Sequence, residues 1–240
     1  MKILKNIIPG IKIYGCLKYL TAYKSQIDSA RKAGDIEAEK EAILKATDSW
    51  GNHILDAFNI EVVVNGKENI PEEGPVVYVS NHQGYADIPL CCAVLTKIQF
   101  GFVAKDVLEK VPLYGNWIKR IRSVLLKRDD ARASLRTINE AIELIEQGYS
   151  MLVFPEGTRS RCHEMAEFKK GSLRLATKPG VPVVPITIDG TYRCFEEKGF
   201  FEGNHTFTIT VHPAIPTADM SKPEANNLAE RVQEIVKSAL

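Results

Sequence analysis

The chain has 240 residues, of which 45% are hydrophobic and 25% are charged, values typical of a folded globular domain. This composition excludes a disordered or low-complexity protein, and the length suffices for one large domain with a substantial core. The net charge of +1 excludes attachment to nucleic acid or an anionic membrane by overall charge, and five cysteines, an odd number, favour free thiols in a reducing compartment.

Residues 1–58 predict an amphipathic helical hairpin. Residues 1–24 contain five lysines and no acid, and the apolar residues at 4, 7, 8, 11 and 14 follow helical spacing. Pro9-Gly10 predicts a kink or split in this first helix, and Gly34-Asp35 predicts a break in a second helix over 27–58. Such a basic segment suits the headgroup layer of a membrane, although a helix packed on its own domain has the same pattern.

Residues 59–240 predict an α/β domain with a mixed, partly parallel sheet flanked by helices. Short runs rich in Val, Ile and Phe predict strands over 60–64, 76–80, 100–104, 124–126, 151–154, 183–188 and 207–211. Helical patterns lie between several of them, notably over 131–147, and strands that alternate with helices imply parallel pairs. Ser221 to Glu224 forms a capping box ahead of the last helix.

The first polar cluster follows the strand over 76–80 and has the sequence NHQGYAD at residues 81–87. A histidine that acts as a general base needs a partner on its other ring nitrogen, and Asp87 can fold back to His82 for this purpose. No serine completes a triad, so the nucleophile can be a hydroxyl of the substrate. The alternative is an ordinary loop histidine beside an aspartate that caps the next helix.

A second polar cluster, FPEGTRSR at residues 154–161, follows the strand over 151–154. Backbone N–H groups around Gly157 and Thr158, together with the guanidinium of Arg159, can hold a phosphate. Glu156 is suited to accept from a substrate hydroxyl or to hold an arginine. The alternative is a polar turn with a weak surface Glu–Arg pair.

Basic residues also gather near two further strand ends, where they can form a rim beside an anionic site: Lys105, Arg120, Arg122, Lys127 and Arg128. The alternative is a set of separate solvated surface charges, and Lys127 is assigned to it. They are not interleaved with aromatic residues, which argues against a nucleic-acid surface.

Together, the Asn-His-x4-Asp and Phe-Pro-Glu-Gly-Thr-Arg-Ser motifs, in this order and about 70 residues apart, resemble the 1-acylglycerol-3-phosphate acyltransferase family, also called lysophosphatidic acid acyltransferases. The resemblance extends through Lys105, Pro112, Gly115 and Arg128, similar to the second block of the family, and through 181–186, similar to its fourth. The N-terminal hairpin resembles the membrane-docking helices of short bacterial members.

The resemblance implies transfer of a fatty acyl group from an acyl-CoA or acyl-carrier-protein thioester to the free hydroxyl of lysophosphatidic acid, giving phosphatidic acid. His82 would be the general base and Asp87 would orient it. The remaining implied site residues bind substrate: Lys105, Arg128, Glu156, Gly157, Thr158 and Arg159. No metal or cofactor is implied, and the enzyme would be peripheral or monotopic on the cytoplasmic face of a membrane, docked through residues 1–58.

Three alternatives remain open at this point. A related enzyme acting on glycerol 3-phosphate or another lysophospholipid would carry the same motifs. A hydrolase could use Cys92 or Cys162 with His82, and a non-catalytic protein could bind the lipid without acyl transfer. Zinc is not expected, because Cys162-His163 lacks partners at ligand spacing.

Overall fold

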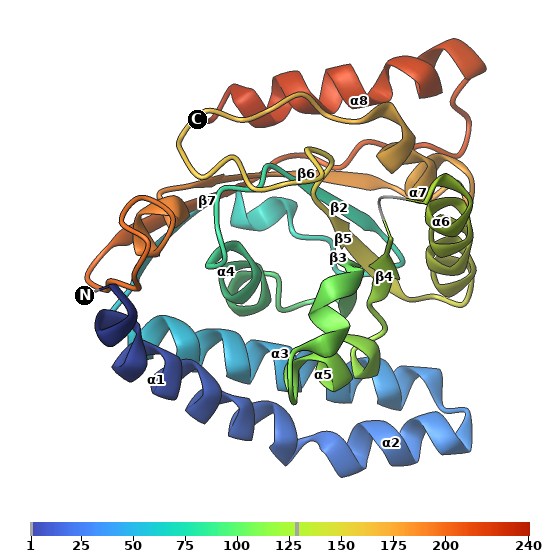
Figure 1. The fold of residues 1–240 in the computed structure, drawn as a ribbon. Helices are drawn as coiled ribbons and strands as arrows, with labels where there is room; N and C mark the ends of the chain where they lie inside the picture. Colours follow the sequence, from blue (N-terminus) through green and yellow to red (C-terminus); the bar gives the residue numbers. More distant parts are fainter. Residues whose placement is uncertain (1, 128–129) are drawn as a thin grey trace.

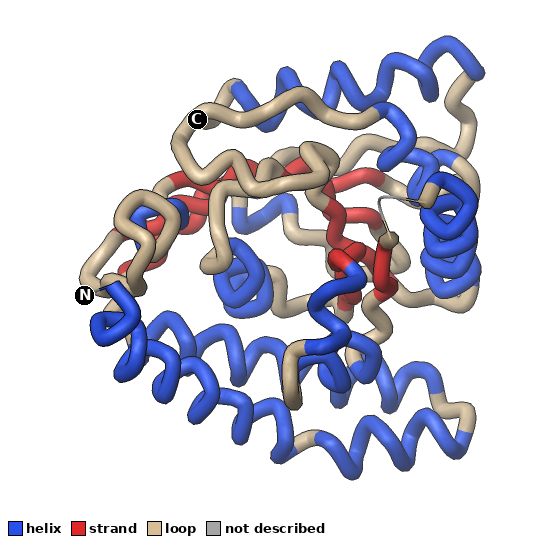
Figure 2. Tube along the Cα trace, in the orientation of Figure 1, coloured by secondary structure: helices blue, strands red, loops and turns tan. Residues whose placement is uncertain are grey.

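The fold is described for residues 2–127 and 130–240 in a computed structural model. A central sheet separates two layers of helices, and a long N-terminal hairpin forms a further layer beneath one of them (Figures 1 and 2). Arg128, predicted as a phosphate ligand, lies outside the described residues.

Within the described residues, seven strands form one sheet in the order β1-β7-β6-β2-β5-β3-β4. All neighbouring pairs are parallel except β6 and β7. The strands are β1 (Glu61–Asn65), β2 (Val77–Ser80), β3 (Phe100–Lys105), β4 (Val124–Leu126), β5 (Ser150–Val153), β6 (Val183–Asp189) and β7 (Thr206–Val211). The predicted strands are therefore present, and the α/β fold class is confirmed.

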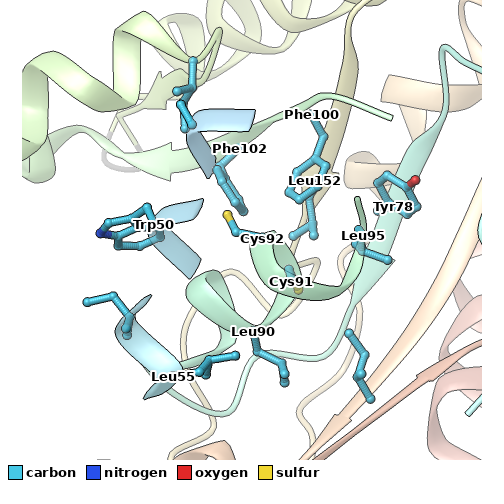
Figure 3. Close-up of a cluster of buried hydrophobic side chains, with 14 of the residues drawn as sticks. Trp50, Leu55, Tyr78, Leu90, Cys91, Cys92, Leu95, Phe100, Phe102 and Leu152 are labelled. Atoms are coloured by element: carbon cyan, nitrogen blue, oxygen red, sulfur yellow. The ribbon is translucent and has the colours of Figure 1, made fainter. Parts of the chain in front are cut away.

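Alternating side chains of the inner strands serve two cores, one on each face of the sheet. On one face, Val77 and Val79 of β2 pack with residues of α6 (Ala131–Glu146), α7 (Arg174–Thr177) and α8 (Lys222–Lys237). On the other face, Tyr78 packs with residues of β3 and α4 (Asp87–Val94), as Figure 3 shows for Phe100 and Leu95 and their neighbours. The predicted capping box of α8 is present.

Short helices fill several of the connections. They are η1 (Lys67–Asn69), η2 (Asp106–Lys110), α5 (Tyr114–Arg120), η3 (Lys170–Leu173) and η4 (Thr191–Cys194).

The hairpin consists of α1 (Lys2–Ala22), α2 (Lys24–Ala33) and α3 (Ile36–Ala57), with α3 running back along the other two (Figure 1). The predicted break at Gly34-Asp35 is present: Gly34 ends α2 with a left-handed φ of 71°, and the Asp35 side chain accepts from Ala38 N at 3.0 Å to cap α3. This break is also the turn of the hairpin, whereas the predicted helices over 1–24 and 27–58 put that turn between residues 24 and 27. Of the predicted kink or split at Pro9-Gly10, the split is absent, because α1 continues through Pro9, and the kink stays a prediction. Pro9 lacks an N–H for the carbonyl of Lys5, but Lys5 is exposed and water can hydrate that carbonyl.

The hairpin shares one core with the sheet and its helices. Trp50 of α3 is buried with Leu90 and Cys92 of α4, and the helices approach so closely that a Cβ at Gly51 would lie 2.7 Å from the carbonyl oxygen of Pro89. The division at residues 58 and 59 stays a prediction. The packing nevertheless fixes the helix that begins at Asp87 against the hairpin.

None of the helices in residues 2–127 and 130–240 combines the length and the apolar character needed to cross a bilayer.

Candidate active site

The predicted polar residues gather at one edge of the sheet. The strands β6, β2, β5 and β3 are neighbours and run parallel, so their carboxyl ends meet at the same edge. The His82 loop follows β2, the segment 154–161 follows β5, and Lys105 ends β3. In open α/β sheets, this is the edge at which ligands bind.

His82 and Asp87 form a direct pair. Nδ1 of His82 lies 2.6 Å from Oδ2 of Asp87, whose side chain is completely buried. The same oxygen accepts from Gly84 N at 3.0 Å, and Oδ1 of Asp87 accepts from the hydroxyl of Thr191. Asp87 is the first residue of α4 and does not cap its N–H groups, so its contacts are those of a partner for the imidazole rather than of a helix cap.

The contact with Asp87 selects the tautomer of the His82 ring. A carboxylate only accepts, so Nδ1 of His82 carries a hydrogen, and in the neutral imidazole the lone pair is then on Nε2. The ring stacks on Phe154, with centroids 4.1 Å apart, and 19% of the side chain is exposed. Among the described residues, no hydroxyl or thiol hydrogen-bonds to Nε2 of His82. His82 can therefore take a proton from a molecule that enters the site.

Glu156 is buried and supports the loop that carries His82. Its Oε1 accepts from His82 N at 2.6 Å, and its Oε2 accepts from Ala166 N at 2.7 Å. Burial raises the pKa of the Glu156 carboxyl, and the two backbone hydrogen bonds act against that rise. The carboxylate does not form a surface pair with an arginine, and its predicted contact with the glycerol part of a substrate stays a prediction.

The segment after β5 turns at Gly157, whose φ of 75° favours glycine, and continues through the exposed Thr158 to Arg159. Nη1 of Arg159 donates to Oε1 of Glu196 at 2.6 Å, and its guanidinium lies 3.7 Å from the centre of the Tyr85 ring. Tyr85 and Arg159 come from the two predicted motifs, so the fold brings the motifs together. The other donors of the guanidinium stay available for an anion.

Two more cations border this edge of the sheet. Lys105 is exposed at the end of β3, and Nζ of Lys169 lies against Gly157, where an added Cβ would be 2.6 Å away. Two of the other predicted rim residues are held by the hairpin instead of the site. Arg120 pairs with Asp28 of α2, and Arg122 pairs with Glu39 of α3.

Sequence reasoning missed several polar residues of the site. Thr191 supports Asp87, Glu196 holds Arg159, and the Asn81 side chain bridges β2 to β6 through both backbone groups of Ile188, at 2.8 Å each. A signal existed for Thr191, which follows the carboxyl end of the predicted strand over 183–188. None existed for Glu196, which lies in a loop without a recognisable motif.

The cysteines do not form a second reactive centre. Cys92 is buried beneath α3, and Sγ of Cys162 contacts backbone carbonyls of its own loop. Burial raises the pKa of both thiols, which disfavours the reactive thiolate. Among the described residues, no group of three or more His, Cys, Asp or Glu side chains is placed to hold a metal ion.

Comparison with known proteins agrees with the geometry of this edge. The sequence profile of the family described as Acyltransferase matches residues 61–189, which contain both motifs. A 1-acyl-sn-glycerol-3-phosphate acyltransferase of Borreliella burgdorferi is 31% identical over 179 residues, covering 74% of this chain and 71% of that protein. One of Chlamydomonas reinhardtii is 36% identical over 186 residues, covering 75% of this chain.

A solved structure is similar along the whole chain. The crystal structure of the 1-acyl-sn-glycerophosphate (LPA) acyltransferase PlsC from Thermotoga maritima has a TM-score of 0.79 and 29% sequence identity, and the match covers 100% of this chain and 96% of that one. The chain spans about half the length of the algal relative, 53%. The predicted family is confirmed: this chain belongs to the acyltransferase family that includes the 1-acyl-sn-glycerol-3-phosphate acyltransferases.

Proposed function

We propose that this chain transfers a fatty acyl group from an acyl-CoA or acyl-carrier-protein thioester to the free hydroxyl of 1-acylglycerol 3-phosphate, giving phosphatidic acid. The observation that carries the proposal is the His82–Asp87 pair, in which Asp87 occupies Nδ1 and leaves Nε2 for the substrate. The names of the relatives support the choice of acceptor.

The residues account for each proton and bond of the reaction. Nε2 of His82 takes the hydroxyl proton as the acceptor oxygen attacks the thioester carbonyl. The tetrahedral intermediate then collapses, the carbon–sulfur bond breaks, and His82 returns the proton to the departing sulfur. Asp87 stabilises the imidazolium formed between these steps. Thioesters are already activated, so the reaction as proposed uses no metal, no cofactor and no acyl-enzyme intermediate.

Arg159 is proposed to bind the phosphate of the acceptor, with Lys105 and Arg128 as further ligands. The support is its position: the guanidinium lies over the Tyr85 ring next to the His82 loop, with one donor used by Glu196. A planar guanidinium suits bidentate contact with phosphate. Gly157 and Thr158 complete the proposed turn around the acceptor.

The decisive experiment is an assay of the purified full chain with lysophosphatidic acid and each thioester donor in turn, measuring phosphatidic acid and free thiol. Glycerol 3-phosphate and an uncharged monoacylglycerol serve as alternative acceptors, and excess chelator tests the proposed independence of metals. Binding of lysophosphatidic acid without thiol release would identify a lipid-binding protein instead. Turnover that does not depend on any acceptor would identify a hydrolase.

We also propose that α1 places the enzyme on the cytoplasmic face of a membrane. Its first half exposes Leu4, Ile8 and Ile11, which are 71%, 67% and 67% exposed, whereas Cys16, Leu17 and Leu20 in its second half are buried. The second half therefore packs on its own domain, as the alternative interpretation expects. The exposed apolar residues, interspersed with lysines, suit the headgroup layer.

Point substitutions test this surface better than a truncation, because removing α1 would uncover the core beneath Leu17 and Leu20. The double variant Ile8→Asp/Ile11→Asp should lower binding to vesicles of anionic phospholipid and phosphatidylcholine about tenfold or more. Leu135→Asp is the matched control, since Leu135 is an exposed leucine on α6. An equal loss of vesicle binding in the two variants, or unchanged binding of Ile8→Asp/Ile11→Asp, would refute the proposed membrane contact of α1.

A further inference from the structure

The buried carboxylate of Asp87 has a second oxygen that the His82 pairing does not use. Oδ2 accepts from both Nδ1 of His82 and the N–H of Gly84, while Oδ1 accepts from the hydroxyl of Thr191. Both Asp87 and Thr191 are completely buried, so water does not replace a lost partner at low cost. The orientation of the carboxylate thus depends on a side chain 104 residues further along the chain.

Rigid elements place the Thr191 hydroxyl. Asn81 ties the end of β2 to Ile188 of β6, so the two strand ends that carry Asp87 and Thr191 keep a fixed spacing. Gly190 then turns the chain with a φ of 91°, and a Cβ there would lie 2.8 Å from the carbonyl oxygen of Thr206. Thr191 opens η4 directly after this turn.

The hydroxyl has one hydrogen and two acceptors in range. Oε1 of Gln83, 3.4 Å from Oγ1 of Thr191, is a neutral amide oxygen, whereas the acceptor on Asp87 is a carboxylate oxygen. Hydrogen bonds to ionised acceptors are the stronger ones, so the hydrogen belongs to Asp87. Thr191 thereby holds the plane of the carboxylate and, through it, the plane of the His82 ring.

We propose that Thr191 is the positioning residue of the His82–Asp87 pair: its hydroxyl fixes the Asp87 carboxylate in the orientation that keeps the hydrogen of His82 on Nδ1 and Nε2 toward the acceptor. The effect on turnover rests on the proposed acyl transfer, but the effect on the His82 ring does not. Thr191 touches no substrate, so its loss should change the rate of the chemical step and leave substrate affinity alone.

The test compares Thr191→Val, which keeps the shape of the side chain, with Thr191→Ser, which keeps the hydroxyl. In the full chain, NMR follows the hydrogen-bonded Nδ1–H of His82, whose proton signal lies far downfield when the acceptor is a carboxylate. Thr191→Val should lose or strongly shift this signal and lower kcat about 10- to 100-fold, with KM for both substrates within about twofold. Thr191→Ser should retain the signal and keep kcat within about threefold.

Thr217→Val is the matched control, because Thr217 is also buried and its hydroxyl donates to the carbonyl of Val181 at 2.8 Å, away from the site. It should reduce stability without altering kcat or the His82 signal. The proposal is overturned if Thr191→Val keeps the wild-type signal, if Thr191→Ser behaves like Thr191→Val, or if Thr217→Val lowers kcat equally. A wild-type chain that transfers no acyl group, yet shows the predicted NMR changes, would refute the proposed function and leave this inference standing.

Discussion

Asp87 and Glu39 are both buried carboxylates, 0% and 1% exposed, but their surroundings differ in kind. Asp87 contacts an imidazole, a backbone N–H and a hydroxyl. Glu39 contacts the guanidinium groups of Arg31 and Arg122 at 2.6 to 2.9 Å and the hydroxyl of Tyr149 at 3.0 Å. One carboxylate faces a group that can gain a proton, and the other faces permanent cations.

The Glu39 cluster fastens the turn of the hairpin to the sheet domain. Arg31 lies near the end of α2, Arg122 precedes β4, and Tyr149 precedes β5. Burial acts to raise the pKa of the Glu39 carboxyl, but the hydrogen bonds from Arg122 and Arg31 outweigh it, so that the pKa lies below its ordinary value. The two arginines compensate the charge of Glu39 permanently, and the carboxylate stabilises the packing of the hairpin on the sheet domain.

Burial alone therefore does not distinguish a carboxylate with a proposed catalytic role from one that stabilises the fold. Among the described residues, no permanent cation hydrogen-bonds to Asp87, so in the proposed reaction its charge is available when His82 becomes an imidazolium. The charge of Glu39 is already compensated by Arg31 and Arg122. The partners of a buried acid, and whether they can change charge, separate the two roles.

The largest expected difference between Asp87 and Glu39 is in their effect on turnover. Asp87→Asn should lower kcat about 100- to 10,000-fold, because an amide neither stabilises the imidazolium nor fixes the ring tautomer. Glu39→Gln should leave kcat per folded molecule within about threefold. Steady-state assays with lysophosphatidic acid, corrected for the folded fraction, measure both; similar losses in the two variants would contradict the division of roles.

Glu39 should matter for the free energy of unfolding rather than for kcat. Glu39→Ala should lower the free energy of unfolding by about 2–3 kcal/mol, since two arginines lose their partner. The loss is smaller than for a fully buried pair because the side chains of Arg31 and Arg122 are 33% and 26% exposed and can be hydrated. Denaturant titration measures it, and a Glu39→Ala protein as stable as wild type would show that the cluster does not fasten the hairpin.

The Arg159–Glu196 pair is a third case, because it joins a permanent cation to a buried acid at the candidate site itself. Burial raises the pKa of the Glu196 carboxyl more than the hydrogen bonds from Tyr85 and Arg159 lower it, the reverse of Glu39. Arg159→Ala should raise KM for lysophosphatidic acid about tenfold, with a smaller change in kcat, because the phosphate charge is present before and during the reaction. A monoacylglycerol acceptor should be unaffected; equal losses with both acceptors would show that Arg159 supports the loop instead.

The smallest effect concerns acid stability. The folded pKa of Glu39 lies below its ordinary value, so its contribution is present above pH 4.5 and is lost as the pH falls through the lowered value. Glu156, with a raised pKa, has the opposite sign: its contribution is present at low pH and is lost as the pH rises through the raised value. Denaturant unfolding between about pH 3 and pH 7 should therefore show a shallower acid loss in Glu39→Gln than in wild type, and parallel curves would contradict this.

Much of the fold followed from local patterns. Runs of β-branched residues predicted the strands, Gly34-Asp35 predicted a helix break, and the spacing of His82 and Asp87 predicted their pairing, because these signals lie within a few residues of one another. The contacts that support the site are not local. Arg122 meets Glu39 across 83 residues and Thr191 meets Asp87 across 104, and no periodicity encodes such a meeting. Arg122, predicted as part of a basic rim beside an anionic site, is for this reason a structural residue that holds Glu39.

The place of β7 between β1 and β6 determines when the molecule can be completed during synthesis. The pairing of β1 with β7 joins residues such as Asn65 and Thr210, which are 145 positions apart, and Asn6 of α1 bonds to Phe201 across 195. Until residues 206–211 have left the ribosome, β1 lacks its neighbour in the sheet, while the helices of the hairpin can already form. Contacts of such long separation form late and slowly. The growing chain therefore presents the apolar and basic face of α1 through most of its synthesis, before the sheet that carries the chemistry is closed.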